Sequence, residues 1–397
     1  MGAVLPAAPK QDVERVEAGI AAFIHEFKAL RRDLHEHPEL SFQEHRTSAI
    51  VAELLAHWGY SVTTGIAGTG VVGTLRKGQG SKALGIRADM DALPITEATG
   101  LPYASRNAGV MHACGHDGHT TVLLAAARFL AESGRFDGTL NLIFQPAEEH
   151  GGGANRMIGE GLFERFPCDA VFGLHNWPCV GEGHFGCVTG PAMASVDQIT
   201  ITVRGKGGHG AAPHETVDPV VASAHIITAL QTVVSRNVDP LDMGVVTVGS
   251  IHGGNAPNVV PESVELKLTA RAFKPEVREI LKQRIPAIAR AQAESFGATA
   301  EVLYLPGYPA VLNHEAETEL ARSVARDTFG DARVDAGFRP RTASEDFAFM
   351  LLQRPGSYVF VGNGDGASLH SPYYDFNDAI LAPSATYWVR LAERFLA

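Results

Sequence analysis

The chain has 397 residues, of which 45% are hydrophobic and 19% charged, values typical of soluble globular proteins and not of disordered or low-complexity chains. At roughly 100 to 200 residues per domain, this length predicts two or three domains. The net charge of −11 disfavours nucleic acid as a partner. No apolar run approaches the ~18 residues of a membrane span, and the apolar part of residues 1–15 is too short for a secretory signal. We therefore expect a cytoplasmic protein with no membrane partner.

The first half of the chain alternates helical and strand patterns. The predicted elements are helices over 12–30 and 46–58, strands over 69–76 and 83–88, a helix over 117–133, and strands over 138–145 and 169–174. Strands separated by helices predict an α/β domain whose mixed, mostly parallel sheet has helices on both faces. Ligands of such sheets bind beyond the carboxyl ends of the strands, where the polar motifs of this chain fall.

From about residue 195 the pattern changes to β-α-β-β-α-β. The elements are predicted over 196–204, 216–235, 244–251, 262–271, 276–296 and 299–305, an order typical of a ferredoxin-like domain. Helices near 314–328, 345–352 and 378–396 and a strand near 356–361 then resume the first style. We expect residues 1–194 and 307–397 to form one domain, into which residues 195–306 are inserted.

The densest group of metal-binding residue types is MHACGHDGHTT, residues 111–121. It offers His112, Cys114, His116, Asp117 and His119 at the predicted start of a helix, and thiolates and imidazoles are good ligands for zinc and similar ions. The alternative is a glycine-rich turn with solvated histidines, in which the aspartate caps the helix.

Three further signals are weaker when taken singly. The strand ending FQPAEE carries the adjacent carboxylates Glu148 and Glu149, a pair that is more often plain surface. His175 ends an apolar strand and His370 lies in a turn near the C-terminus, and each alone is more often a structural histidine. The prediction of a site rests on their combination.

Taken together, these motifs resemble the M20 family of metallopeptidases, in particular its amidohydrolase branch of hippurate hydrolases, N-acyl-amino-acid amidohydrolases and auxin-conjugate hydrolases. The resemblance covers nearly the whole chain. It is carried by RRDLHEHPELSFQE (31–44), IRADMDALPITE (86–97), HACGHDGH (112–119), FQPAEE (144–149), GLHNWP (173–178), GKGGHGAAPH (205–214), APNVVPE (256–262), SEDF (344–347) and LHSPYYDFND (369–378).

The resemblance implies a dinuclear metal site. It places the metal ligands on Cys114, His116, Glu149, His175 and His370 and the catalytic carboxylate on Glu148. This set suits two tetrahedral ions: a bridging thiolate and a bridging water fill four of their eight coordination positions, and four terminal ligands remain. Without the resemblance, the sequence does not select these five residues over His112 or His119.

One motif departs from the wider family. Where the broader group has a metal-binding His-x-Asp, this chain has Asp89 and Asp91, so the histidine is missing. We expect Asp91 not to bind metal itself but to contact and orient a metal-binding imidazole. For Asp89, an outer ligand and a residue that merely closes a strand remain equally open. His35 and His37 resemble a zincin helix, but Pro38 interrupts the pattern and we assign them to structure.

The inserted domain carries three polar residues that the resemblance makes functional. It implies that His209 reaches the active site of the partner subunit and binds the carbonyl oxygen, although delivery within one chain is an open alternative. Asn258 and Arg271 resemble the pair that holds the substrate amide and carboxylate, for which a planar guanidinium is suited. Without the resemblance, a solvated loop, a turn-forming asparagine and an exposed strand arginine would explain them.

The resulting hypothesis is a metal-dependent amidohydrolase that cleaves N-acyl amino acids, hippurate-like or N-acetyl, to a carboxylic acid and a free amino acid. Two divalent ions, zinc or manganese before cobalt or nickel, are expected in each subunit of a homodimer built through the inserted domain. The alternatives are a dipeptidase or aminopeptidase of the same family and a metal-binding protein without catalysis. The presence of Glu148 disfavours the last of these.

Overall fold

The computed structural model describes residues 10–397, so the N-terminal residues considered above as a secretory segment lie largely outside the described part. The chain forms two compact units. Within the described part, the large unit comprises residues 10–190, Leu312–Arg339 and Asp346–Ala397; the inserted unit comprises Pro191–Val311 and Pro340–Glu345. The sequence placed the boundaries after 194 and 306 and kept 340–345 in the first domain. That short segment instead stays with the inserted unit, because the Ala194 N–H donates to the carbonyls of Arg341 and Ala343.

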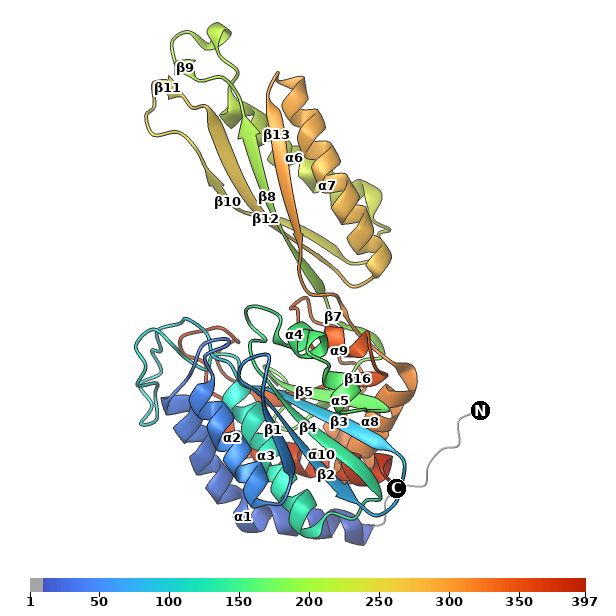
Figure 1. The fold of residues 1–397 in the computed structure, drawn as a ribbon. Coiled ribbons are helices and arrows are strands. Elements are labelled where there is room, and N and C mark those ends of the chain that lie inside the picture. Colours follow the sequence, from blue (N-terminus) through green and yellow to red (C-terminus); the bar gives the residue numbers. More distant parts are fainter. Residues whose placement is uncertain (1–9) are drawn as a thin grey trace. The chain divides into compact units, whose positions relative to one another are not determined.

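The large unit is built around one eight-stranded sheet (Figure 1). Its strands are β1 (Ser61–Ile66), β2 (Gly70–Lys77), β3 (Ala83–Asp89), β4 (Gly138–Gln145), β5 (Ala170–Pro178), β6 (Phe185–Cys187), β15 (Val334–Asp335) and β16 (Gly356–Gly364). They are ordered β1-β2-β4-β3-β5-β16-β6-β15. The central strands β4, β3, β5 and β16 are parallel, whereas β1 and β2 pair antiparallel with their neighbours. Strand β6 is antiparallel to β16 and parallel to β15. The mixed, mostly parallel sheet predicted from the sequence is confirmed.

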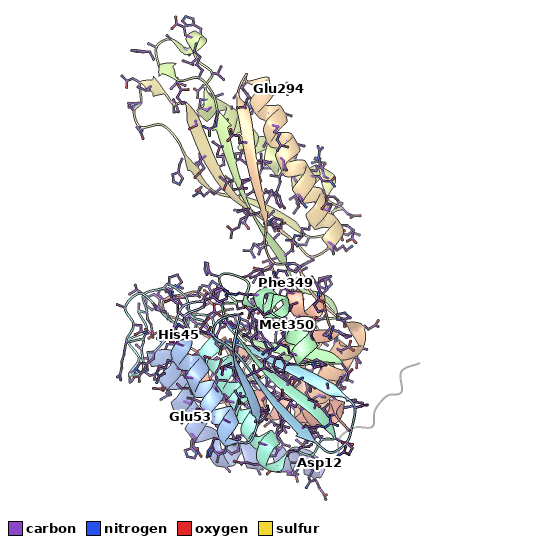
Figure 2. The ribbon with its side chains drawn as sticks, in the orientation of Figure 1. Asp12, His45, Glu53, Glu294, Phe349 and Met350 are labelled. Atoms are coloured by element: carbon purple, nitrogen blue, oxygen red, sulfur yellow. The ribbon has the colours of Figure 1, made fainter. Side chains whose placement is uncertain are left out.

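Helices cover both faces of this sheet. They are α1 (Lys10–Glu36), α2 (His45–His57), α3 (His116–Ser133), α4 (Gly153–Gly159), α5 (Leu162–Arg165), α8 (Glu315–Phe329), α9 (Ala348–Leu351) and α10 (Leu381–Phe395). Figure 1 shows α1, α2 and α3 on one side and α4, α5 and α9 on the other. Figure 2 labels Met350 of α9, which is fully buried, and Glu53 of α2, which is exposed. Among the described residues, no helix is long and apolar enough to cross a bilayer.

The long helix α1 shows why such layers form. Its buried side chains recur every three or four residues, at Val13, Val16, Ile20, Phe23 and Phe27, so one apolar stripe faces the core. The stripe joins a single hydrophobic cluster with α3, α10 and the sheet. This packing holds the carboxyl ends of β3, β4 and β5 in a fixed arrangement, and the loops that follow them carry the polar motifs.

The inserted unit is a separate α/β body with its own core. Its principal elements are β8 (Ser195–Arg204), α6 (Pro219–Asn237), β10 (Gly244–His252), β12 (Ser263–Ala272), α7 (Pro275–Ser295) and β13 (Thr299–Pro306). The sheet order β10-β12-β8-β13, with every pair antiparallel, is the ferredoxin-like arrangement expected from the sequence. Ile199, Ile201 and Val203 of β8 are buried in the cluster that the two helices share.

The elements that the sequence missed are short. They include α4, α5, β1, β6, β15 and the pairs β9 (Gly208–His209) with β11 (Val259–Val260) and β7 (Gly190–Met193) with β14 (Val311–Asn313). Most have two to four residues, too few for periodicity to reveal. The pair of β9 and β11 carries His209, one of the residues that the resemblance makes functional.

Candidate metal and catalytic site

Asp91 contacts several residues at the centre of the candidate site. Its carboxylate accepts hydrogen bonds from the backbone N–H groups of Glu148 and Glu149, both at 3.0 Å, and from the Ser41 hydroxyl at 2.7 Å. Nδ1 of His116 lies 2.9 Å from the Asp91 carbonyl and 3.3 Å from its Oδ1. Burial alone would raise the pKa of Asp91, but these contacts outweigh it and lower the pKa. The imidazole-orienting role predicted for Asp91 thus agrees with its contacts, which also reach both glutamates.

The glycine-rich turn before α3 presents Cys114 and His116. Gly115 has φ = 94°, and a Cβ there would lie 2.4 Å from Asn176 Oδ1, so both the backbone and the space require glycine. His116 then starts the helix with Nδ1 held by Asp91. Its Nε2 is buried without a hydrogen-bond partner.

The turn after β4 presents Glu148 and Glu149 in a constrained backbone. Ala147 adopts φ = 55°, an uncommon value for a residue with a side chain. The buried carboxylate of Glu44 holds this turn by accepting the Ala147 N–H at 2.9 Å. Glu148 is 6% exposed, and its Oε1 accepts the Asp346 N–H at 3.4 Å.

His175 lies near the carboxyl end of β5 with its tautomer defined by the backbone. Nδ1 is 2.6 Å from the carbonyl oxygen of Asn176, which can only accept, so Nδ1 carries the proton. Nε2 is therefore the nitrogen with a free lone pair, and it lies 3.4 Å from Sγ of Cys114. This is the arrangement of a histidine prepared to bind a metal.

His370 approaches the same place from the C-terminal loop. It has φ = 64°, and its N–H donates to the carbonyl of Ala113 at 2.8 Å, which ties the loop to the cysteine turn. Its Nε2 lies 3.1 Å from Oε1 of Glu149. Its side chain is 53% exposed, so this ligand-type group is the most accessible of the five.

These residues fit divalent cations. Ligand-type atoms lie within 4.8 Å of one another in three overlapping groups: Cys114, His116 and His175; Cys114, Glu149 and His370; and His116, Glu148 and Glu149. Oε1 of Glu149 is buried between two imidazoles, 3.1 Å from Nε2 of His370 and 3.9 Å from Nε2 of His116. A soft thiolate, imidazoles and carboxylates form a donor set suited to zinc and its neighbours.

The charge balance supports the same conclusion. Burial raises the pKa of the Cys114 thiol well above its ordinary value, and the carboxylates of Glu149 and Glu148 add to the effect. For His116, burial lowers the pKa, but Asp89 and Asp91 outweigh it and raise the value to about 10. The negative charge concentrated here attracts a positive one, which divalent ions would supply.

The structure treats the other histidines of the motif differently. His112 is fully buried, and it belongs to none of the clusters of ligand-type atoms found among residues 10–397. His119 lies close to Asp89 and His116, but its Nδ1 is 2.6 Å from Asp89 Oδ1 and its Nε2 contacts Asn176. His35 near the end of α1 is hydrogen-bonded to Asp117, with its Nδ1 2.8 Å from Oδ2, a contact that suits the structural role assigned to it.

The polar residues predicted in the inserted unit do not all come together. His209 pairs with Val259 in the two-stranded sheet of β9 and β11, and the Gly210 N–H donates to the Asn258 carbonyl at 2.8 Å, so His209 and Asn258 share one exposed tip. Arg271 lies near the far end of β12, where its guanidinium donates to the Thr342 carbonyl at 2.9 Å. Most of the ten-residue strand β12 separates Arg271 from the tip that carries His209 and Asn258, a distance of roughly 25 Å. Within one chain, Asn258 and Arg271 therefore do not form a pair.

Sequence reasoning missed several buried polar residues that support the site: Glu44, Arg87, Gln145, Asn176, Asp346 and Tyr374. Arg87 illustrates their role, because its guanidinium contacts Asp89 at 2.7 Å, Gln145 at 2.8 Å and Asp346 at 3.1 Å. The available signal was a polar or charged residue inside an apolar strand or beside a motif. A buried polar residue indicates that a hydrogen-bond partner exists, but the sequence does not identify that partner.

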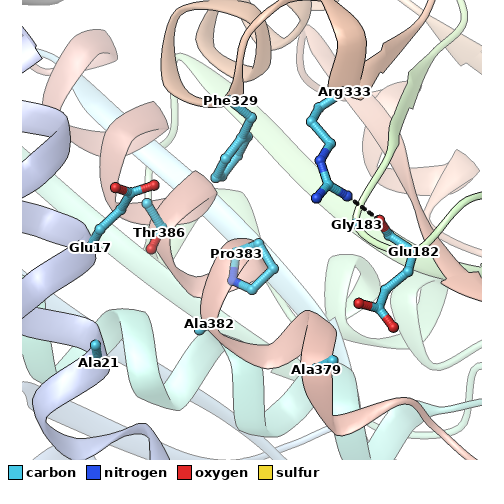
Figure 3. A pocket seen from close by; sticks show the side chains of 10 residues that line it. All are labelled: Glu17, Ala21, Glu182, Gly183, Phe329, Arg333, Ala379, Ala382, Pro383 and Thr386. Atoms are coloured by element: carbon cyan, nitrogen blue, oxygen red, sulfur yellow. Dashed lines mark hydrogen bonds between the residues drawn. The ribbon is translucent and has the colours of Figure 1, made fainter.

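A separate surface cavity of about 370 Å³ lies between α1, α8 and α10 (Figure 3). It is lined by Phe329, Pro383 and Thr386 together with Glu17 and Arg333, whose guanidinium donates to the Glu182 carbonyl. None of the residues lining it belongs to the predicted site. We therefore do not place the reaction there.

Comparisons with known proteins agree with this geometry. Residues 85–394 match the model of peptidase family M20/M25/M40. The chain is 44% identical to hippurate hydrolase of Campylobacter jejuni over 94% of this chain and 97% of the relative, and 41% identical to N-acetyl-L-cysteine deacetylase of Bacillus subtilis over 92% and 87%. The chain belongs to peptidase family M20/M25/M40.

A solved structure extends the likeness to three dimensions. The YXEP protein of Bacillus subtilis, described as a dinuclear metal binding peptidase from the M20 family, superposes with a TM-score of 0.83 at 33% identity. The match covers 95% of this chain and 99% of that one. The resemblance inferred from the sequence motifs is therefore confirmed, and the enzyme is a metal-dependent hydrolase that acts on amides.

Proposed function

We propose that this enzyme hydrolyses the amide bond of N-acyl amino acids, of the hippurate or N-acetyl type, so that one amide and one water give a carboxylic acid and a free amino acid. The observation that carries the proposal is the cluster of ligand-type groups beside the buried carboxylate of Glu148. The names of two relatives, a hippurate hydrolase and an N-acetyl-L-cysteine deacetylase, support this substrate class.

Cys114, His116, Glu149, His175 and His370 would hold two divalent ions, for which we propose zinc or manganese. When bound, such ions supply Lewis acidity, which polarises a carbonyl and brings the pKa of water toward neutrality. The chain's own residues transfer the proton and stabilise the developing negative charge. Glu148 takes a proton from the attacking water and returns it to the nitrogen as the carbon–nitrogen bond breaks. His209 donates to the carbonyl oxygen as negative charge develops on it.

The geometry of the inserted unit supports a homodimer with shared sites. We propose that one substrate is held by Arg271 of one chain and by His209 and Asn258 of the other, because a single inserted unit keeps these groups roughly 25 Å apart. Edge strand β13 offers a surface for self-association, since its Leu303 and Leu305 are 56% and 51% exposed.

A substrate panel tests the reaction. Metal-reconstituted enzyme should be offered hippurate, N-acetyl amino acids, indole-acetyl conjugates and unblocked dipeptides, with kcat/KM measured for each. We expect the acylated amino acids to be preferred. A preference for unblocked dipeptides would contradict the proposal and favour a dipeptidase or aminopeptidase.

Subunit mixing tests the shared site. Glu148→Gln and His209→Ala proteins, each inactive, should regain activity when their subunits exchange, because one of the two sites in a mixed dimer then has both residues intact. Verified exchange without recovery would contradict the shared site. A fully active monomer would contradict the dimer itself.

A further inference from the structure

A chain of buried polar contacts joins residues that are adjacent to the candidate metal ligands. Nδ1 of His119 is 2.6 Å from Oδ1 of Asp89, and its Nε2 is 2.8 Å from Oδ1 and 3.2 Å from the backbone nitrogen of Asn176. The side-chain amide of Asn176 in turn contacts the Tyr374 hydroxyl at 2.5 Å. All four residues are at most 3% exposed. Water does not reach this network to replace a lost contact, so each contact carries weight.

Both carboxylate oxygens of Asp89 are already engaged. Oδ2 accepts a hydrogen bond from Arg87 at 2.7 Å, and Oδ1 faces His119. An ionised carboxylate only accepts, so Nδ1 of His119 carries the proton. Asp89 therefore acts here as the partner of His119, a more specific role than either of the two that the sequence left open.

The network joins three segments that carry proposed ligands. His119 lies one turn after His116 on α3. Asn176 follows His175, and its carbonyl accepts the His175 Nδ1 proton at 2.6 Å. Tyr374 lies in the loop of His370, and its N–H donates to the Ser371 carbonyl at 3.0 Å. The rings of His119 and His175 are also in contact, with centroids 4.6 Å apart.

We propose that His119 is a positioning residue, which links α3, the end of β5 and the C-terminal loop through Asn176 and Tyr374 so that His116, His175 and His370 converge before metal arrives. This inference rests on the metal site proposed above. It assigns His119 no direct contact with the ions, although His119 lies in a group with Asp89 and His116 that could itself hold one. Partners of this kind are worth roughly 10- to 100-fold in metal affinity.

The decisive experiment compares two tyrosine variants. Tyr374→Phe removes the hydroxyl that contacts Asn176. Tyr60→Phe is the matched control, because Tyr60 is also buried and its hydroxyl donates only to the Ala127 carbonyl at 2.9 Å within the hydrophobic core. His119→Asn tests the other end of the link, since its amide N–H can still donate to Asp89 but cannot reach Asn176.

Zinc and cobalt affinity should be measured by chelator competition, zinc content by elemental analysis, and the stability of the metal-free protein by thermal unfolding. We expect Tyr374→Phe and His119→Asn to bind each metal roughly 10- to 100-fold more weakly, with two ions still bound at saturation and a changed cobalt absorption spectrum. Tyr60→Phe should leave affinity and spectrum unchanged, whatever it does to the unfolding temperature.

Two results would overturn the inference while leaving the proposed function in place. One is wild-type affinity in both Tyr374→Phe and His119→Asn. The other is the loss of one whole ion at saturation in His119→Asn, which would make His119 a ligand. If the wild-type protein bound no divalent ion, the proposed function would fail, and the positioning role would fail with it.

Discussion

The polar residues of the large unit and those of the inserted unit are held in opposite ways. Around Asp91, carboxylates and imidazoles are buried and bonded to one another, so their geometry is defined by the chain itself. His209 and Asn258 instead lie exposed at the two-stranded sheet of β9 and β11, and Nδ1 of His209 accepts only the local Ala211 N–H at 3.0 Å. The difference teaches that the candidate metal ligands are organised within one chain, whereas exposed groups such as His209 and Asn258 would gain electrostatic strength only if another surface excluded water from them.

The largest effect on turnover should come from Glu148, in the buried site of the large unit. Glu148→Gln should retain metal and lower kcat by roughly 10² to 10⁴, because the proton acceptor is lost while the shape is kept. Steady-state kinetics and metal analysis measure this, with the exposed Glu53→Gln of α2 as the control. Near-normal turnover in Glu148→Gln would remove the proton-transfer role.

Substitution of His209 should lower kcat less than substitution of Glu148, without a change in stability. His209→Ala should lower kcat by roughly 10² to 10³, as expected when one donor to the developing oxyanion is removed. Its unfolding temperature should match that of the wild type, because the side chain is exposed. His214→Ala, at an exposed histidine of the same loop, should change neither quantity. An equal loss in both variants would point to the loop rather than to His209.

Arg271 should affect substrate choice more than turnover. Arg271→Lys should raise the activation free energy derived from kcat/KM for N-acyl amino acids by about 1.5 to 3 kcal/mol, since a point charge does not reproduce a two-pronged contact with a carboxylate. The corresponding amides should lose little. Arg204→Lys is the control, because Arg204 is exposed on the adjacent strand and pairs with Glu301 at 3.1 Å. Equal losses for acid and amide substrates would contradict carboxylate binding.

The smallest effect concerns the stability of the inserted unit at low pH. Burial would raise the pKa of Asp197, but hydrogen bonds from Arg278, Tyr304 and the Gly307 N–H outweigh it and lower the pKa. The folded pKa thus lies below the unfolded one, so this carboxylate stabilises the unit above the unfolded pKa of about 3.9, and the contribution is lost as pH falls through the folded pKa.

Asp197→Asn should therefore lower the unfolding temperature at pH 7 and flatten its dependence on pH below about 4. Thermal unfolding of both proteins across pH 3 to 7 measures this. Parallel pH profiles for the wild type and Asp197→Asn would show that Asp197 does not contribute to the dependence.

The sequence by itself predicted two units and most of their long elements, and together with the family resemblance it named the residues of the candidate site. Apolar periodicity located α1, α3, α6 and α7, because a long helix or strand must bury one face whatever its partners are. The motifs around Cys114, Glu148 and His370 were visible because metal binding restricts residue type.

Only the tertiary structure decided which polar groups meet. The contacts of His119 with Asp89 and of Asn176 with Tyr374 join residues 30 and 198 positions apart, and no local pattern specifies such pairs. The same holds for Asn258 and Arg271, which the resemblance suggested as a pair and which an extended strand keeps apart within one chain. Periodicity reports which side of an element is buried, whereas the partner of a buried polar group depends on how elements distant in sequence pack together.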